Sequence, residues 1–332
     1  MRKMATIRVI DSILPIEGAD AIEVAVIGGW KVVVKKNEYS TGDKVIYCEI
    51  DSWIPTDIAP FLTKDGHEPK EYNGVKGERL RTVKLRGQVS QGLILPITQS
   101  SCSEGDDVSE ALGIQKWEPS QEFMAPNSKG NFPSFIRKTD QERVQNLKRE
   151  LQKAIDSSED FEVSEKVDGS SMTVYHNEGV FGVCSRNLEL KEDINNTFWA
   201  TALKYNLREK LTAYGSNIAI QGELIGPGIQ GNKYNLTDFE FRVFNVFDID
   251  TQQYYTPSST GSIILDLELE SVPILNTWYN ISEGTTIDDL LKQAEGKSKL
   301  NPNTEREGLV FKSEHGNFSF KAISNKWLMK NE

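Results

Sequence analysis

The sequence predicts an α+β fold, in which a small all-β N-terminal module precedes a C-terminal domain of antiparallel sheets with packed helices. Two observations carry this prediction. Up to about residue 96, short β-like runs are separated by turn signals, whereas from Phe161 onward strand-like runs alternate with helical stretches. Proline, serine, asparagine and charged residues fill the region between these patterns. We therefore predict a module at residues 1–115, a linker and helix at 116–158, and a domain at 159–332.

The strands of the N-terminal module are predicted from apolar and β-branched runs at residues 21–27, 30–34 and 44–50. Turn signals separate the runs, at Gly28-Gly29, Thr41-Gly42-Asp43 and Asn73-Gly74. Short strands punctuated in this way indicate a small all-β module.

The linker contains prolines that prevent long regular structure, at Pro119, Pro126 and Pro133. A helix is predicted after them, because Thr139-Asp140-Gln141-Glu142 has the form of a capping box. Apolar residues then recur at helical spacing, at Val144, Leu147, Leu151 and Ile155. Basic residues cluster at this helix start, where free backbone amides favour phosphate, namely Arg137, Lys138 and Arg143. The alternative is a solvated, charged helix end.

The C-terminal domain is predicted to hold helices near residues 197–212 and 287–294 among its strands. In the apolar run at 242–250, strand alternation puts Val243, Asn245 and Phe247 on one face. Only one face of this strand can meet a ligand. A tight turn is predicted at Gly226-Pro227-Gly228.

Length and composition describe an ordinary globular protein of 332 residues, which is long enough for two domains. The formal net charge of -11 argues against indiscriminate coating of nucleic acid but leaves room for a local basic groove. Neither a signal peptide nor a run of about 18 apolar residues is present, so we expect a soluble cytoplasmic protein without membrane contact. The cysteines and histidines show neither metal-ligand spacing nor a disulfide framework.

The string Glu165-Lys166-Val167-Asp168-Gly169-Ser170-Ser171 is the most informative in the chain, because Lys166 stands two residues before Asp-Gly. Alone, the string also fits a strand that ends in an Asp-Gly turn beside a solvated lysine. Further strings follow it in order: SRN at 185–187, QGELIGPG at 221–228, RVFNVFDID at 242–250, EGLVFK at 307–312 and SFKAISNKW at 319–327. Chance does not readily produce such an ordered set.

With Lys166, these strings resemble the collinear motifs of the covalent nucleotidyltransferase superfamily, which comprises polynucleotide ligases and mRNA capping enzymes. The resemblance covers the last half of the chain. In the N-terminal half, the string from Lys84 to Leu93 resembles one found in tRNA-binding OB-fold modules. The whole N-terminal pattern is similar to the OB-like module attached to one family of ATP-dependent RNA ligases.

The resemblance implies a role for each motif residue. Lys166 would carry AMP from ATP, Arg186 and Glu223 would hold the ribose, and Lys312 and Lys321 would contact the α-phosphate. Phe247 and Val310 would clamp the adenine, and Glu165 and Ser171 would complete the nucleotide site. Asp168, Glu223 and Glu307 would hold a hydrated Mg²⁺ or Mn²⁺, which fits the preference of these cations for oxygen.

A lysine amine is protonated at neutral pH, because its ordinary pKa is about 10.4, and is then no nucleophile. Cationic neighbours or a metal must lower the pKa of Lys166. We expect Lys312, Lys321 and Lys326 to supply positive charge both for this purpose and against the phosphates.

Contacts with RNA are predicted for two groups of basic residues. In the N-terminal module they are Lys84 and Arg86, since OB folds bind single strands on one barrel face and its loops. The alternative is a solvated strand face with Val83 and Leu85 turned inward. The second group is Arg137, Lys138, Arg143 and Lys326. Some ligases carry Lys-x-Lys in the final motif, but here Ala322 and Ile323 follow Lys321, and Lys326 is the next lysine.

Together, these observations predict an ATP-dependent RNA ligase that seals 3′-hydroxyl and 5′-phosphate ends through lysyl-AMP and an adenylylated RNA end. We expect nicked duplex RNA as substrate and a monomeric enzyme. One alternative is a GTP-dependent capping-type guanylyltransferase, although such enzymes typically place the OB domain after the catalytic domain. A non-catalytic RNA-binding OB protein is another.

Overall fold

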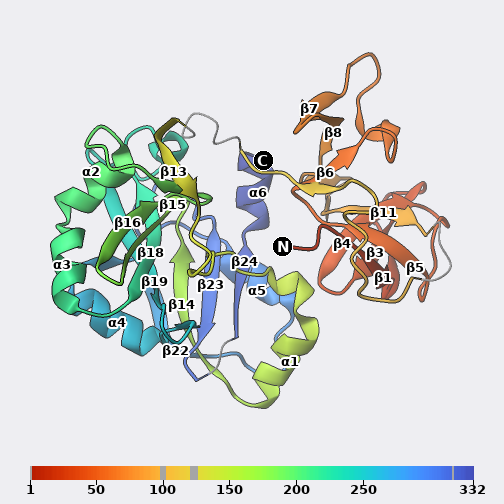
Figure 1. The fold of residues 1–332 in the computed structure, drawn as a ribbon. Helices are drawn as coiled ribbons and strands as arrows, with labels where there is room; N and C mark the ends of the chain where they lie inside the picture. Colours follow the sequence, from red (N-terminus) through yellow and green to blue (C-terminus); the bar gives the residue numbers. More distant parts are fainter. Residues whose placement is uncertain (1, 98–101, 120–125, 316–317) are drawn as a thin grey trace. The chain divides into compact units, whose positions relative to one another are not determined.

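The structure is a computed structural model that describes residues 2–97, 102–119, 126–315 and 318–332 (Figure 1). These residues form two compact units. The first contains the described residues up to 119 together with Gln145–Lys148 and Leu328–Glu332. The second contains residues 126–144 and the described residues of Arg149–Trp327. The region that we predicted as a separate linker and helix is therefore divided between the two units.

The first unit consists of short antiparallel strands, as predicted. Its sheets have the orders β1-β5-β11, β2-β3-β4 and β12-β6-β8-β7, and β9 pairs with β10 in a hairpin. The strands are β1 (Ala5–Val9), β2 (Ser12–Pro15), β3 (Ile22–Ile27), β4 (Trp30–Lys35), β5 (Lys44–Cys48), β6 (Ser52–Pro55), β7 (Lys70–Tyr72), β8 (Val75–Arg79), β9 (Val83–Leu85), β10 (Gln88–Ser90), β11 (Leu93–Pro96) and β12 (Gln115–Lys116). A short 3-10 helix spans Pro60–Leu62. The predicted strands at 21–27, 30–34 and 44–50 are confirmed as β3, β4 and β5.

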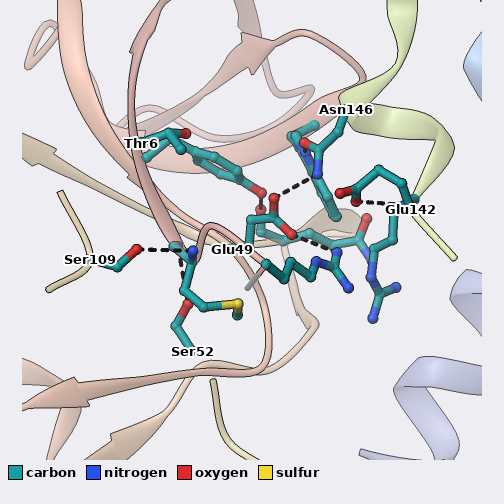
Figure 2. A network of polar contacts seen from close by, with 12 residues as sticks. Thr6, Glu49, Ser52, Ser109, Glu142 and Asn146 are labelled. Atoms are coloured by element: carbon teal, nitrogen blue, oxygen red, sulfur yellow. Dashed lines mark hydrogen bonds and ion pairs between the residues drawn. The ribbon is translucent and has the colours of Figure 1, made fainter. Parts of the chain in front are cut away.

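Polar contacts around the buried Glu49 fix segment 145–148 within the first unit (Figure 2). The side-chain amide of Asn146 donates to Glu49 Oε1 at 2.6 Å, and its oxygen accepts from Trp30 Nε1 at 2.7 Å. The Arg2 guanidinium lies 2.6 Å from Glu49 Oε2 and offsets the buried charge. Because both carboxylate oxygens are occupied, the segment is held by directed contacts that hydrophobic spacing could not predict.

The second unit contains two sheets. The eight-stranded sheet has the order β13-β17-β16-β15-β18-β19-β20, with β21 paired to β19, and the four-stranded sheet has the order β22-β14-β23-β24. The strands of the first are β13 (Ser128–Asn131), β15 (Ser170–Asn177), β16 (Val180–Cys184), β17 (Leu188–Leu190), β18 (Ile218–Ile225), β19 (Glu240–Asp248), β20 (Gln253–Tyr254) and β21 (Glu270–Ser271), and those of the second are β14 (Asp160–Lys166), β22 (Ile274–Asn280), β23 (Gly308–Ser313) and β24 (Ser319–Ile323).

Helices α2 (Thr197–Lys204), α3 (Leu207–Tyr214) and α4 (Pro257–Asp266) cover the outer face of the eight-stranded sheet (Figure 1). The single helix predicted at 197–212 is thus two helices, since Asn206 takes a left-handed φ of 52° between them. Helix α5 (Ile287–Ala294) is confirmed, whereas α4 and α6 (Asn325–Asn331) were not predicted. Among the described residues, no helix is long and apolar enough to cross a membrane.

The predicted capping box at 139–142 is wrong. These residues are not helical, and the helix α1 (Lys148–Asp156) begins only after a 3-10 turn at Val144–Asn146. The carbonyl oxygen of Glu142 instead accepts from the backbone N–H of Lys321 at 2.8 Å, and Arg143 forms a parallel bridge with Lys321. Tertiary pairing with β24 therefore overrides the local helix signal, and the basic residues around it do not lie at a helix start.

Candidate active site

Strand register gathers the motif lysines on one face of the four-stranded sheet. Lys166 is the last residue of β14, and β14 pairs with β23 so that Ser164 lies opposite Val310 and Glu162 opposite Lys312. Val310 in turn lies opposite Lys321 on β24. Since alternate residues share a face, these side chains point the same way as Lys166.

The opposite face of this sheet is an aromatic core. Phe311 and Phe320 are stacked with ring centroids 4.7 Å apart, and Phe161 packs edge-on to Phe320 at 5.8 Å. All three rings are fully buried. The core fixes the register that brings the lysines of β14, β23 and β24 together.

Glycine at position 169 allows the Lys166 strand to meet β18. The backbone N–H of Gly169 donates to Glu223 Oε1 at 3.2 Å, and a Cβ at this position would lie 2.5 Å from the Leu224 carbonyl oxygen. Only glycine fits this approach. The backbone N–H of Asp168 donates to the Tyr234 hydroxyl at 2.7 Å. The Asp-Gly pair thus places the Lys166 turn against Glu223.

Carboxylates surround Lys166. Its Nζ lies 2.8 Å from Glu307, and the Asp168 carboxylate forms an ion pair with Lys233. Burial lowers the pKa of Lys166, but the negative charges of Glu307, Glu223 and Asp168 outweigh burial and raise it. Lys166 is therefore an ammonium among these carboxylates, and the expected lowering of its pKa by neighbouring lysines does not outweigh their charge.

The same cluster supplies oxygen atoms that suit a hard cation. Burial, together with the charges of Glu307 and Asp168, raises the pKa of Glu223 to about 8 against the opposing effect of Lys166. Within the part of the chain that the structure describes, no three such side chains are close enough to bind a metal directly. A cation that keeps its waters fits this set better than a fully dehydrated one.

Lys312 contacts Phe244 on β19. Its Nζ donates to the backbone carbonyl of Phe244 and lies 5.8 Å from the centroid of the Phe244 ring. Burial lowers the pKa of Lys312 to about 8, although the charge of Glu162 opposes this shift. Burial raises the pKa of Glu307, and the positive charges of Lys166 and Lys321 oppose this shift.

Phe247, which we predicted to clamp a base, has no exposed surface in the structure. Phe247 is fully buried in a cluster with Tyr175, Cys184 and Ala219, whereas Val243 packs in the helix-covered core. A β-bulge separates the two residues. Gln221 pairs with Asn245 and Gly222 pairs with Val243, so Phe244 has no partner on β18. Phe244 beside Lys312 is the aromatic residue that can face a nucleotide together with Val310.

The predicted ribose and base contacts lie near segment 137–142. Arg186 Nη2 is 3.1 Å from Asp140 Oδ1, and the hydroxyls of Ser171 and Thr139 are 3.3 Å apart. Glu165 is buried, and its Oε2 accepts from the Lys299 backbone N–H at 2.8 Å. Its Oε1 has no hydrogen-bond partner, so one buried acceptor remains for a ligand.

The residues predicted to contact RNA have varied environments. Lys84 and Arg86 are exposed on β9 and its turn, where Val83 and Leu85 are also exposed, at 47% and 44%. The alternative with these two apolar residues turned inward is therefore wrong.

In the second unit, Arg137 is exposed, whereas Lys138 binds Asn187 Oδ1 at 2.8 Å. Lys326 lies 3.3 Å from Glu305, and Arg143 is only 5% exposed. A buried guanidinium can reach RNA only after a local rearrangement.

Sequence reasoning missed Lys233, Tyr234 and Phe244. Lys233 and Tyr234 follow the glycine turn after the Glu223 strand, and proximity to that motif was an available signal. For Phe244 the signal was Gly222, since an isolated glycine inside a strand marks a bulge or a close approach. A Cβ at Gly222 would lie 2.5 Å from the Arg242 carbonyl oxygen.

The RNA ligase family matches residues 159–327, and an OB-fold domain matches residues 4–97. The chain belongs to the RNA ligase family. Solved structures of Naegleria gruberi RNA ligase are 45% identical to it: variants with AMP and Mn and with ATP and Mn give TM-scores of 0.92 and 0.91, and each match covers 99% of both chains. The complex with PPi gives 0.90 with the same identity and coverage. No curated protein sequence matches the chain. The predicted family and α+β class, with an OB-fold module, are confirmed.

Proposed function

We propose that this RNA ligase uses ATP and a divalent cation to join RNA 3′-hydroxyl and 5′-phosphate ends, with nicked duplex RNA as its substrate. The observation that carries the proposal is the 2.8 Å pair of Lys166 and Glu307 within a cluster that also holds Asp168 and Glu223. The similar Naegleria structures contain ATP or AMP with Mn, which supports the same nucleotide and kind of metal here.

Each residue of the cluster has a role in the first step. Lys166 attacks the α-phosphorus of ATP, the bond to pyrophosphate breaks, and Lys166 loses a proton as lysyl-AMP forms. Lys312 and Lys321 hold the α-phosphate, while Phe244 and Val310 flank the base and Arg186 and Glu223 hold the ribose. A Mg²⁺ or Mn²⁺ held through its waters by Asp168, Glu223 and Glu307 would neutralise phosphate charge and offset the carboxylates that keep Lys166 protonated.

In the following steps AMP passes to the RNA 5′-phosphate, and the 3′-hydroxyl then displaces AMP to form the phosphodiester. The protein contributes mainly positioning and charge neutralisation in both transfers.

Incubation of the protein with α-labelled ATP or GTP and Mg²⁺ tests this proposal against a guanylyltransferase. Label from ATP should stay on the protein through denaturation and move to the 5′ end of nicked RNA. Preferential labelling by GTP would indicate a capping-type enzyme, and failure to label with either nucleotide would indicate an RNA-binding protein.

We predict that ATP binding weakens above pH 8 because Lys312 loses its proton there. Burial lowers the pKa of Lys312 to about 8, so in the free protein the amine is increasingly neutral above that pH, while a bound phosphate requires the ammonium. With Mg²⁺ and a Lys166→Ala background that cannot react, log Kd should rise with a slope of about one per pH unit above pH 8. Calorimetric titrations between pH 7 and 9.5 measure this slope.

Lys312→Arg is the matched variant, since arginine remains charged throughout this range. Its Kd should stay nearly constant with pH. An equal slope in both proteins would assign the titration to another group.

A second prediction concerns the exposed hairpin residues Lys84 and Arg86. Each lost phosphate contact lowers the slope of log affinity against log salt by roughly 0.7 to 0.9. The double variant Lys84→Ala, Arg86→Ala should therefore bind nicked RNA more weakly and with a shallower salt slope. Fluorescence anisotropy over a salt series measures both quantities.

The control is the double variant Lys35→Ala, Lys36→Ala, which removes two exposed lysines from the end of β4 and the adjoining turn. It should bind RNA as the unmodified protein does. If the Lys84, Arg86 variant loses affinity at an unchanged slope, these residues support the fold and do not contact phosphate.

A further inference from the structure

Lys233 is held in place by the loop that follows β18. Its carbonyl oxygen accepts from Asn301 Nδ2 at 2.8 Å, and the Asn232 side chain bonds the backbone of Leu236 at 2.9 and 3.0 Å. Asn232 and Gly231 have left-handed φ values of 47° and 70°, so the loop turns sharply just before the lysine. This backbone aims Lys233 at the active site.

The amine of Lys233 has two specific partners there. It forms an ion pair with Asp168 Oδ2, in which the Lys233 and Asp168 side chains are 25% and 13% exposed. It also lies 4.7 Å from the centroid of the Trp327 ring, a favourable cation–π distance. A partly desolvated pair with an aromatic neighbour is stronger than a solvated surface pair.

Lys166 and Lys233 each pair with a different carboxylate of the cluster. Lys166 is paired with Glu307 at 2.8 Å, and Lys233 is paired with Asp168. Like charges this close would otherwise repel one another. A cation that uses Asp168 must therefore compete with an ammonium that already occupies its Oδ2.

We propose that Lys233 is the resident counter-ion of Asp168, which the divalent cation displaces when it binds. The inference rests on the proposed metal role of Asp168. Lys233 is then a positioning residue: it holds Asp168 in place while the site is empty of metal, and it sets how tightly the protein binds the cation. Removal of its amine should tighten metal binding, although it should lower the stability of the metal-free protein.

The test is to measure Mn²⁺ binding to the full-length protein without nucleotide, using electron paramagnetic resonance to detect the bound ion. Lys233→Met retains the apolar stem beside Trp327 but lacks the amine, and it should bind Mn²⁺ about tenfold more tightly than the unmodified protein. In an Asp168→Asn background, the same change should leave Mn²⁺ affinity unaltered, because the competed carboxylate is gone. Equal or weaker binding by Lys233→Met would overturn the inference.

Thermal melting gives a second readout. Without metal, Lys233→Met should melt at a lower temperature than the unmodified protein, and Mn²⁺ should raise its melting temperature by more. Lys204→Met is the matched control, since Lys204 also pairs with an aspartate, Asp238 at 2.7 Å, and lies 5.4 Å from an aromatic ring, that of Tyr205. Its response to Mn²⁺ should not change, and a larger Mn²⁺ response there would count against Lys233.

The outcomes separate this inference from the proposed function. If the unmodified protein binds Mn²⁺ and Asp168→Asn weakens that binding, the metal role of Asp168 stands whatever Lys233→Met does. If Asp168→Asn has no effect on Mn²⁺ affinity, the metal role fails and the inference about Lys233 fails with it.

Discussion

A Lys166→Ala protein should form no covalent nucleotide adduct. Removal of an enzymic nucleophile lowers rates on the order of 10⁶-fold, which here means a signal at background. The change also removes the 2.8 Å partner of Glu307, whose pKa burial already raises, so this carboxyl can take up a proton and the fold is expected to survive. Denaturing gels with α-labelled ATP measure the adduct.

Lys312→Ala is the informative control for this result. Lys312 shares the sheet face of Lys166 and contacts the backbone of Phe244, so its loss should slow labelling without moving the attachment site. Peptide mass spectrometry of the unmodified protein should place AMP on Lys166. Adduct on any other lysine, or labelling of Lys166→Ala, would remove Lys166 from its proposed role.

The sequence was sufficient to predict which motif residues share a sheet face, because these residues lie on strands of regular alternation. Lys166, Val310, Lys312 and Lys321 share a face through uninterrupted antiparallel pairing, which a period of two describes. The same rule failed to describe Val243 and Phe247, which do not share a face, because the bulge opposite Gln221 and Gly222 shifts the alternation by one residue. A single irregular residue therefore places Val243 and Phe247 in different cores.

Tertiary contacts account for the other failures. Segment 139–142 carries a good local helix signal, but the backbone of Lys321 pairs with Glu142 and excludes the helix. Lys233 belongs to no regular element, and its contact with Asp168 spans 65 positions in the sequence. Neither contact could be predicted from periodicity or local propensity, which describe near neighbours only.

Replacement of Glu307 by glutamine should slow lysine adenylylation by about 10²–10³-fold, the equivalent of several kcal/mol of lost charge stabilisation. Glutamine keeps the shape of the side chain and removes its negative charge. The matched control is Glu305→Gln, since Glu305 pairs with Lys297 at 2.8 Å and Lys326 at 3.3 Å, whereas Glu307 pairs with Lys166. Single-turnover labelling at several Mg²⁺ concentrations measures the rates, and Glu305→Gln should label normally.

Whether Glu307→Gln labels faster or slower than the unmodified protein distinguishes two roles for this carboxylate. Glu307 has the largest effect among the charges that raise the pKa of Lys166, so its loss lowers that pKa and by itself produces more neutral amine. If Glu307 were only a counter-ion, the variant would label faster than the unmodified protein, most clearly at low pH. If Glu307 also holds the cation, the variant loses the charge that neutralises the triphosphate, and labelling falls at every pH and responds only at higher Mg²⁺. A slower rate despite a more easily deprotonated Lys166 would therefore assign Glu307 to the metal.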